Sequence, residues 1–387
     1  MFKKSYRYGI LLGGRSRKMY WKEKILYITL SLLKVFFPFM KIRSNKIVFV
    51  SLESNKLENE FKMLSKQLMK DNQYDLQYVL FKFDGTLLGS VKYFFVCIHQ
   101  FFEINTSKLV ILDYNNYVVS KFKRKGVQVL QLWHASGAIK KFGNETKRDY
   151  PIANYDYVIA NSDQFKPYYA KAFGVSEQQV IVTGIPKCDC LYNPEYLESR
   201  KIKIIEKYPQ IQNKKIVLYA PTFRGRITSG FKNVYMDLNK LHELLGEEYV
   251  IMYKLHPLLK NHIISNHPNI ICCNSENLYH LFSITDYFIS DYSAIIFDFS
   301  IMNKPMIFYA FDLDKYKEET GIFLDYLNEM PGPVCYNEEE VANSILADEF
   351  DLSKIEVFCR KYHKYNDGHS LSRVLTLIKD IMSKDGA

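Results

Sequence analysis

The chain has 387 residues, which is long for one domain and sufficient for two, since domains usually contain about 100–200 residues. Hydrophobic residues make up 48% and charged residues 24%, a composition that argues against disorder and against a protein with many membrane spans. The net charge of +10 suggests an anionic partner, so its position along the chain matters.

The positive charge is concentrated at the amino terminus. Residues 1–46 contain twelve Lys or Arg and one acid, Glu23, so they carry +11 and the rest of the chain carries −1. Nucleic acid is therefore not an expected partner. Residues 1–44 are also rich in Tyr, Trp and Phe, and a basic aromatic segment is suited to an anionic membrane surface.

Residues 25–40 are predominantly apolar, but Lys34 and Pro38 interrupt them and they are shorter than the ~20 residues that a membrane span needs. We expect this amphipathic stretch to lie in the membrane interface. A helix packed on the first domain is the alternative. A cleaved signal peptide is disfavoured because no small-residue cleavage pattern follows.

From residue 46, short β-rich apolar runs alternate with helix-length segments. This alternation predicts a parallel sheet covered on both faces, in an N-terminal domain over residues 45–193. The predicted strands lie in the runs 46–51, 76–83, 108–114, 127–134, 155–162 and 179–184, and an amphipathic helix is predicted over 58–70.

A polar stretch, residues 194–213, is predicted to link this domain to a second one over residues 214–350. The second series has its apolar runs at 214–222, 248–257, 269–275, 286–291 and 304–312. Residues 351–387 are predicted to form a C-terminal helix that packs across the domain junction. The predicted fold is α/β, with two Rossmann-like, doubly wound domains facing each other across a cleft, where such sheets bind ligands at their strand carboxyl ends.

Two polar clusters end strands of the first domain. The first contains His134 and Ser136, with Lys140 shortly after, and a His at a strand end can reach the cleft as a general base. The second contains Lys187 and Asp189 after a Gly-x-Pro turn that can direct them to the cleft. The alternatives are a structural histidine and an ordinary interdomain turn.

Three further clusters end strands of the second domain. Thr222 and Arg224 close its first strand, and a guanidinium there has the geometry to bind phosphate. Lys254 and His256 end the next strand, on one side by strand alternation. Ser293 precedes a predicted helix that begins near Ala294, with Asp291 and Asp298 alongside, and a helix amino terminus can bind phosphate. A plain Ser cap is the alternative.

Together, two histidines, several cations and a helix amino terminus indicate a site for a diphosphate donor, because phosphoryl transfer depends on positioning and charge stabilisation. There is no P-loop, no GxGxxG motif that opens a helix and no DxD pair after a strand, which disfavours kinases, NAD enzymes and metal-dependent glycosyltransferases. The seven cysteines lack zinc-ligand spacing, and reduced thiols in the cytoplasm are expected. We therefore predict no cofactor and no metal.

At these residues the sequence resembles the CDP-glycerol glycerophosphotransferase family, the teichoic acid primases and polymerases of bacterial cell walls. The matching motifs lie in family order over residues 130–335. They are QLWHASG (131–137), TGIPKCD (183–189), LYAPTFRG (218–225), YKLHP (253–257), ISDYSAIIFDF (289–299), KPMIFYAFDLDKY (304–316), GIFLDY (321–326) and PGP (331–333).

The resemblance implies a GT-B-like fold, a peripheral position at the cytoplasmic face of the membrane, and attack by an acceptor hydroxyl on the β-phosphorus of CDP-glycerol or CDP-ribitol. CMP would leave, and the acceptor would be an undecaprenyl-diphosphate-linked disaccharide. His134 and His256 would be the catalytic pair, with His134 as base and His256 as phosphoryl stabiliser, or the reverse. Arg224, Lys254 and Ser293 would contact the pyrophosphate. Asp291 and Asp298 would order the donor loop or bind its hydroxyls, Thr222 would lie on the donor side, and Ser136, Lys140, Lys187 and Asp189 on the acceptor or phosphate side.

Three residues depart from the family pattern. The family usually has Gly at the position of Ala135, often Arg at that of Lys187 and commonly Ser at that of Ala294. The short chain favours a primase or short-form transferase over a polymerase. The alternatives are a nucleotide-sugar glycosyltransferase on the same fold and a non-catalytic membrane-bound glycan- or nucleotide-binding module.

Overall fold

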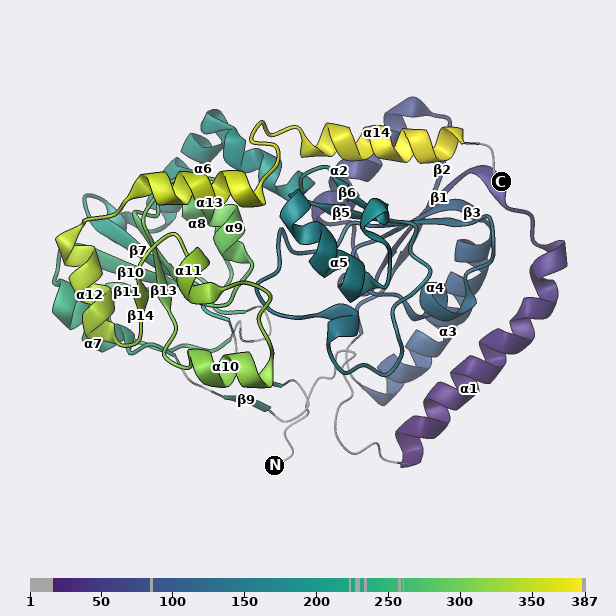
Figure 1. The fold of residues 1–387 in the computed structure, drawn as a ribbon, viewed down its shortest axis with the longest axis horizontal. Helices are drawn as coiled ribbons and strands as arrows, with labels where there is room; N and C mark the ends of the chain where they lie inside the picture. The colour runs from purple at the N-terminus through teal and green to yellow at the C-terminus, as the bar shows by residue number, and fades with distance from the viewer. Residues whose placement is uncertain are drawn as a thin grey trace.

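The computed structural model describes residues 17–83, 86–222, 224–226, 230–232, 235–256, 259 and 261–384. It shows two α/β domains side by side, each built on a six-stranded parallel sheet (Figure 1). The predicted fold class of two doubly wound α/β domains is confirmed.

The N-terminal sheet has the order β2-β1-β3-β4-β5-β6. Every residue of β3 is buried, because helices cover both faces of the sheet, and this explains the nearly continuous apolar runs in the sequence. The strands are β1 (Arg43–Ser51), β2 (Asp75–Leu80), β3 (Ser107–Leu112), β4 (Gln128–Gln131), β5 (Tyr157–Ala160) and β6 (Val180–Val182).

The helices of this domain begin at residues that cap them. Thr86 accepts a hydrogen bond from Gly89 N at 2.8 Å at the start of α3, and Asn116 accepts one from Val119 N at the start of α4. The elements are α2 (Asn59–Leu68), η2 (Met69–Asp71), α3 (Leu87–Asn105), α4 (Tyr117–Phe122), η3 (Gly143–Glu145), η4 (Asp163–Phe165), α5 (Lys166–Phe173), η5 (Glu177–Gln179) and η6 (Pro186–Tyr192).

The C-terminal sheet has the order β11-β10-β7-β12-β13-β14, with neighbours paired in parallel. Sequence analysis did not predict β14 or the separate β8–β9 hairpin, because both are too short to give an apolar run. The elements are β7 (Lys215–Tyr219), β8 (Arg224–Arg226), β9 (Gly230–Lys232), α7 (Leu238–Leu245), β10 (Tyr249–Tyr253), β11 (Ile270–Cys272), α8 (Leu278–Phe282), β12 (Tyr287–Ser290), α9 (Ile295–Ser300), β13 (Met306–Tyr309), α10 (Leu313–Glu319), α11 (Tyr326–Glu329), β14 (Val334–Cys335) and α12 (Glu338–Ala347).

The segment between the sheets and the carboxyl-terminal segment are both helical. The predicted linker contains α6 (Pro194–Lys207) and η7 (Pro209–Ile211), and α6 packs against α8. The prediction of one C-terminal helix is wrong, since the chain forms α13 (Leu352–Tyr362) over the C-terminal domain and α14 (Ser370–Ser383) over the N-terminal one (Figure 1). A turn with Gly368 at φ +68° separates the two helices, a conformation that would strain most other residues.

The amino-terminal segment forms α1 (Arg17–Leu33) and η1 (Lys34–Phe39) along the outer side of the N-terminal domain (Figure 1). Leu30 is fully buried against that domain, whereas Leu32 and Phe39 are 69% and 85% exposed. Residues 1–16 of the predicted membrane segment lie outside the described residues. The rest of the segment is a packed helix that also presents apolar side chains to its surroundings.

The two domains pack directly against each other. The rings of Phe165 and Phe297 meet edge to face at 5.1 Å, and those of Tyr168 and Phe323 stack at 4.7 Å. A Cβ on Gly137 would lie 2.4 Å from the Phe297 ring, so only glycine permits this approach. A β-bridge between Lys140 and Ile322 joins the domains where the carboxyl ends of both sheets meet.

Candidate active site

The first cluster lies on a tight turn immediately after β4. Trp133 has φ +59°, which is unusual for a bulky residue and costs on the order of 1–3 kcal/mol. The buried side chain of Gln131 holds this turn, because its Oε1 accepts from Trp133 N at 2.9 Å and its Nε2 donates to Tyr114 O at 3.1 Å. The strain is therefore stored in the residue that precedes His134.

The His134 imidazole is fixed by aromatic rings and a backbone carbonyl. Its centroid lies 3.9 Å from that of Trp133 and 5.8 Å from that of Tyr114, and the ring donates to the backbone carbonyl of Asp113. His134 is exposed to solvent, yet desolvation by the protein around the domain junction, together with the charges of Lys187 and Lys140, lowers its pKa to about 3. At neutral pH one ring nitrogen thus carries the proton and the other is a free base.

Lys140 lies near the histidines of both domains. The bridge to Ile322 fixes its backbone, supported by hydrogen bonds from Lys141 N to Gly321 O at 3.1 Å and from Phe323 N to Ile139 O at 2.7 Å. Its charge lowers the pKa of both His134 and His256. Burial lowers the pKa of Lys140 itself, against the opposing influence of Asp291.

His256 and Lys254 follow β10. Burial and the charge of Lys140 lower the pKa of His256 to about 4, so this ring is also neutral. The Lys254 ammonium donates to Asn274 O at 3.0 Å, beside the end of β11. Because β10 ends at Tyr253, the strand alternation that predicted a common side for Lys254 and His256 does not extend to them.

Lys187 and Asp298 connect the domains beneath His134. The Lys187 ammonium donates to His134 O at 2.9 Å and lies 3.8 Å from Asp298 Oδ2. Asp298 also accepts from Tyr279 OH at 2.8 Å and from Cys188 Sγ at 3.3 Å. Ser136 is buried here, with its hydroxyl 3.3 Å from Cys188 Sγ. These polar groups join the two domains at the junction. The Ser136 hydroxyl is buried among them and is not exposed to the space beside the histidines.

Arg224 is engaged on all three nitrogens. Its Nε and Nη2 bind Asp312 at 2.7 and 3.0 Å, and its Nη1 binds Asp291 Oδ2 at 2.8 Å and Thr222 O at 2.7 Å. Tyr292 and Tyr316 stack beside it, each centroid within about 5 Å of the guanidinium carbon. Although burial opposes it, the carboxylate of Asp291 and that of Asp312 raise the pKa of Arg224. The guanidinium is a buried ion-pair centre, and its contact with a phosphate stays a prediction.

The residues around Arg224 differ in whether their side chains still have hydrogen-bonding groups available for a ligand. Asp291 accepts from Thr222 N at 2.8 Å as well as from Arg224, so its carboxylate is committed to the loop. Thr222 Oγ1 is buried and has no hydrogen-bond partner among the described residues. Ser293 Oγ lies 3.5 Å from Ile295 N at the start of the short helix α9, close to the predicted position.

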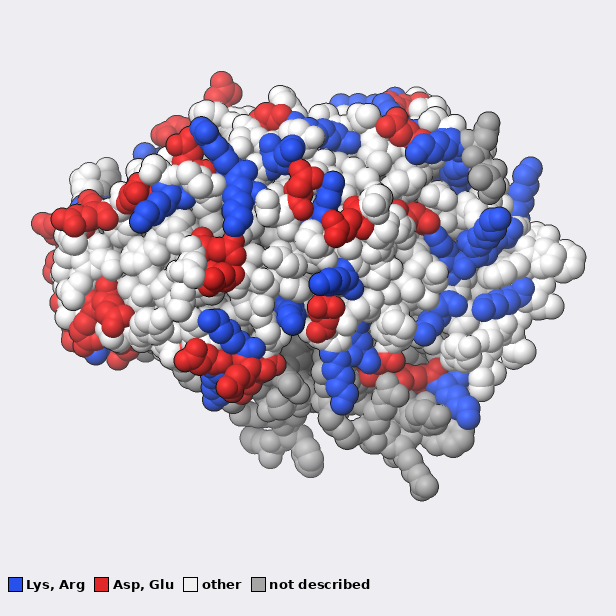
Figure 2. Space-filling model, viewed as in Figure 1, with Lys and Arg blue, Asp and Glu red and all other residues white. Residues whose placement is uncertain are grey.

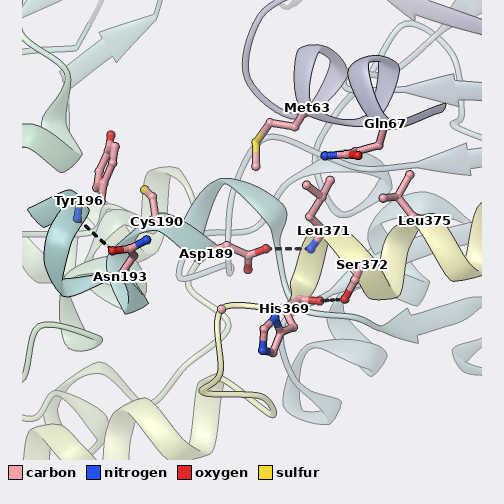
Figure 3. Close-up of a pocket in the computed structure, with 11 residues that line it drawn as sticks. Met63, Gln67, Asp189, Cys190, Asn193, Tyr196, His369, Leu371, Ser372 and Leu375 are labelled. Atoms are coloured by element: carbon pink, nitrogen blue, oxygen red, sulfur yellow. Dashed lines mark hydrogen bonds between the residues drawn. The ribbon is translucent and has the colours of Figure 1, made fainter. Parts of the chain in front are cut away.

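Asp189 lies at a helix start. Its two carboxylate oxygens accept from Ser370 N at 3.0 Å and Leu371 N at 2.8 Å, which caps α14 (Figure 3). It lines a cavity of about 530 Å³ between α2, η6 and α14 that contains neither His134 nor His256 (Figure 3). The structure does not bring Asp189 to the histidines.

The structure thus brings together His134, Lys140, Lys187 and His256, with Asp291 nearby. The sequence analysis did not single out Gln131 and Asp312 as functional residues, although both lie within the quoted motifs. It also missed Asp113, which lies in the run 108–114 but outside the motif region. The sequence shows that these residues lie at or after strand ends. It does not show their partners, which lie 17 to 88 residues away along the chain.

One group of described residues has ligand atoms close enough to hold a metal. His242, Glu247 and His267 place one ligand atom each within 4.8 Å of the others. They precede β10 and β11, at the edge of the sheet opposite the histidines, and His267 Nδ1 already accepts from Asn269 N at 3.2 Å. The prediction that no cofactor or metal takes part therefore stays a prediction for the histidine site.

Comparisons with known proteins agree with this geometry. The model of the CDP-glycerol:poly(glycerophosphate) glycerophosphotransferase family matches residues 32–380. A teichoic acid ribitol-phosphate primase of Bacillus spizizenii is 31% identical, over 90% of this chain and 95% of that protein. A teichoic acid glycerol-phosphate primase of Bacillus subtilis is 36% identical, over 72% of this chain and 74% of that one.

A solved structure of the wall teichoic acid polymerase TagF has a similar fold. It matches with a TM-score of 0.69 and 21% identity, over 95% of this chain and 99% of that chain. This likeness confirms the predicted GT-B-like arrangement of two Rossmann-like domains. The family match over most of the chain, together with the paired histidines, leads to one conclusion: the chain belongs to the CDP-glycerol:poly(glycerophosphate) glycerophosphotransferase family.

Proposed function

We propose that the chain transfers a polyol phosphate from a CDP-activated donor to a lipid-linked glycan in teichoic acid synthesis and releases CMP. The observation that carries the proposal is that His134 and His256 come from opposite domains and that Lys140 lowers the pKa of both. Two neutral imidazoles with a cation near both suit an activated phosphate in a reaction that depends on charge stabilisation.

The chemical step follows from the protonation of these groups. The free ring nitrogen of His134 takes the proton from an acceptor hydroxyl, and that oxygen attacks the β-phosphorus of the donor. The bond from this phosphorus to the bridging oxygen breaks, and CMP leaves with the electron pair. Lys140 and His256 stabilise the charge on the transferring phosphoryl group.

Donor binding prepares His134 for this step. In the free protein the charges of Lys187 and Lys140 help to keep its pKa at about 3, which makes it a weak base. A donor diphosphate would neutralise those cations and raise the pKa of His134 towards neutrality, where proton transfer is most effective. General-base strength is thereby coupled to an occupied donor site.

Some of the predicted donor-site residues are proposed to touch the donor, and others to act through neighbouring residues. Thr222 Oγ1, Ser293 and Lys254 are the side chains we assign to the donor, since the Thr222 hydroxyl has unused capacity among the described residues. Arg224 and Asp291 act through the loop that they hold together. Asp298 acts through the junction, by fixing Lys187 and Cys188.

Donor and acceptor identity are part of the proposal. The two primases compared above carry ribitol and glycerol in their names, so CDP-ribitol and CDP-glycerol are both candidate donors. The acceptor we propose is an undecaprenyl-diphosphate-linked disaccharide. The match along nearly the whole length of the ribitol-phosphate primase supports a primase or short-form transferase.

The test measures CMP release from CDP-glycerol and CDP-ribitol with a synthetic lipid-linked disaccharide. His134→Ala and His256→Ala should each reduce the rate by about 10²–10⁴-fold without a change in melting temperature. His99→Ala, whose side chain is 61% exposed on α3, serves as the control. Near-normal turnover in both histidine variants would overturn the mechanism.

The same assay separates the alternative functions. A nucleotide-sugar glycosyltransferase would be stabilised against heat by UDP-sugars and not by CDP-polyols. A non-catalytic binding module would be stabilised by CDP-polyol without releasing CMP. The proposed transferase requires both stabilisation and CMP release.

We also propose that the protein is a peripheral protein of the cytoplasmic face of the membrane. Apolar side chains on α1 and η1 are exposed, and Lys and Arg are prominent at the α1 and α3 end of the molecule (Figure 2). Helix α3 is the one described helix long and apolar enough to span a bilayer, and it contacts β1, β2, β3 and α4 as a crossover helix while Leu88 and Phe95 on it are exposed. Because Leu30 and β1 belong to the packed domain, the test replaces the exposed residues: Leu32→Ser with Phe39→Ser should weaken binding to anionic vesicles while leaving CDP-glycerol binding intact, and unchanged vesicle binding would contradict this placement.

A further inference from the structure

Three carboxyl groups lie close to His134 on the N-terminal domain. In the sheet order, β1 lies beside β3, and β2 and β4 flank this pair, so the strand order reverses between β1 and β3. Such a topological switch point is where open α/β sheets bind ligands, outside the carboxyl ends of the strands. Asp113 directly follows β3, Glu53 follows β1, and Glu60 lies in the first turn of α2.

Two of these groups have unused hydrogen-bonding capacity. Asp113 Oδ1 and Glu60 Oε1 are buried and accept no hydrogen bond from any described residue. Glu60 is only 8% exposed, so water does not readily reach its oxygens. Because buried carboxyl oxygens are nearly always hydrogen-bonded, these two indicate a ligand that brings donors.

The cluster is in direct contact with the proposed base. The backbone carbonyl of Asp113 accepts from the His134 ring, and the Tyr114 ring stacks on that imidazole. The Asp113 carboxyl accepts a hydrogen bond from the Ser51 hydroxyl, and Ser51 Oγ in turn accepts one from Glu53 N at 3.1 Å. A group bound to these carboxyls therefore lies beside the His134 ring.

The chemistry of the cluster selects the kind of ligand. Burial and the negative charges of Glu53 and Glu60 raise the pKa of Asp113 to about 7, so this carboxyl can both donate and accept hydrogen bonds near neutral pH. Sugar and polyol hydroxyls match that capacity, whereas phosphates would be repelled. Lys140 and Lys187 act on His134, and Lys187 also offsets part of the rise that burial gives the pKa of Glu60, so one cation is shared by the carboxyl cluster and the histidine site.

We propose that Asp113, Glu60 and Glu53, with the Tyr114 ring, form the subsite that binds the hydroxyl-bearing glycan of the acceptor and directs one hydroxyl at His134. This inference rests on the proposed function and deepens it. The carboxyls bind the glycan, and the transfer itself remains with the histidines.

The test compares Asp113→Asn and Glu60→Gln with Glu177→Gln, an exposed carboxyl in η5. Each of the first two variants should raise the acceptor KM by tenfold or more and leave the dissociation constant for CDP-glycerol, measured by calorimetry, within twofold. Glu177→Gln should change neither. An unchanged acceptor KM in both variants, or an equal loss of donor affinity, would overturn the subsite.

A second measurement separates this inference from the proposed function. If the wild-type protein releases no CMP, the proposed function fails, and calorimetry with the lipid-free disaccharide then decides the subsite. Binding to the wild type that is at least tenfold weaker in Asp113→Asn and Glu60→Gln supports it. Equal binding, or no binding to the wild type, overturns it. Circular dichroism shows whether each variant is folded. If Asp113→Asn is unfolded, the comparison of Glu60→Gln with the wild type decides the test.

Discussion

The two domains present their polar side chains to the junction in different states. On the C-terminal side, Arg224 is saturated by Asp291 and Asp312, and the polar groups mostly satisfy one another. On the N-terminal side, Asp113 Oδ1 and Glu60 Oε1 accept no hydrogen bond within the described part of the chain, and His134 follows a strained turn. The ion pairs of the C-terminal domain hold the donor loop in place. The N-terminal domain has hydrogen-bond acceptors that a ligand can use.

The largest effect should come from breaking the scaffold. Arg224→Ala leaves the buried Asp291 carboxylate and the half-buried Asp312 carboxylate without their cation and should cost about 3–5 kcal/mol of unfolding free energy, measured by urea denaturation. Arg360→Ala removes an exposed ion pair on α13 and should cost less than about 1 kcal/mol. If Arg224→Ala were as stable as Arg360→Ala but no longer bound CDP-glycerol, Arg224 would be a donor ligand and the contrast between the domains would fail.

The next effect concerns the strained turn. Gln131→Leu removes both hydrogen bonds that hold Trp133 and Tyr114, so His134 should lose its orientation and kcat should fall roughly 10- to 100-fold, since small misplacements are costly in catalysis. Donor affinity should be unchanged. Gln178→Leu, at an exposed position, is the control. An equal loss of donor affinity would show that Gln131 supports the whole site and not the histidine alone.

A smaller effect should reveal what the unsatisfied carboxyl costs the fold. The pKa of Asp113 is raised from 3.8 to about 7, so the folded protein disfavours its ionised form, and the stability cost grows as pH rises through this range. Asp113→Asn, which is always neutral, should raise the melting temperature by a few degrees at pH 8 and by little at pH 4. Burial also raises the pKa of the neighbouring Glu53 and Glu60, so the wild-type curve is the reference. A difference that is the same at both pH values would contradict the burial of a charge.

The smallest effect concerns the residue that lies away from the histidines. Asp189→Ala removes the cap of α14 and should cost about 0.5–2 kcal/mol of stability with kcat and both KM values unchanged. Thermal unfolding and steady-state kinetics measure the two quantities. A raised acceptor KM would instead place Asp189 on the acceptor side, as the sequence analysis expected.

The fold could be predicted in large part because its elements are local patterns. Eleven apolar runs correspond to eleven of the twelve strands in the two large sheets, since a strand buried on both faces must be apolar along its length. The break between α13 and α14 was not predicted, because one left-handed glycine at residue 368 decides it. The two-residue strand β14 is defined by its pairing with β13 and not by a pattern of its own.

By itself, the sequence determined the two-domain α/β architecture, the family and the two histidines, because periodicity and motif order are properties of the chain. The tertiary structure decided which polar side chains are already hydrogen-bonded or ion-paired to other protein groups. Arg224 and Asp312 are separated by 88 residues, and only the fold brings them within hydrogen-bonding distance, which places the predicted phosphate ligand in a buried ion-pair centre. The same packing leaves Asp113 Oδ1, beside His134, without a hydrogen-bond partner among the residues that the structure describes, and no pattern along the chain contains that information.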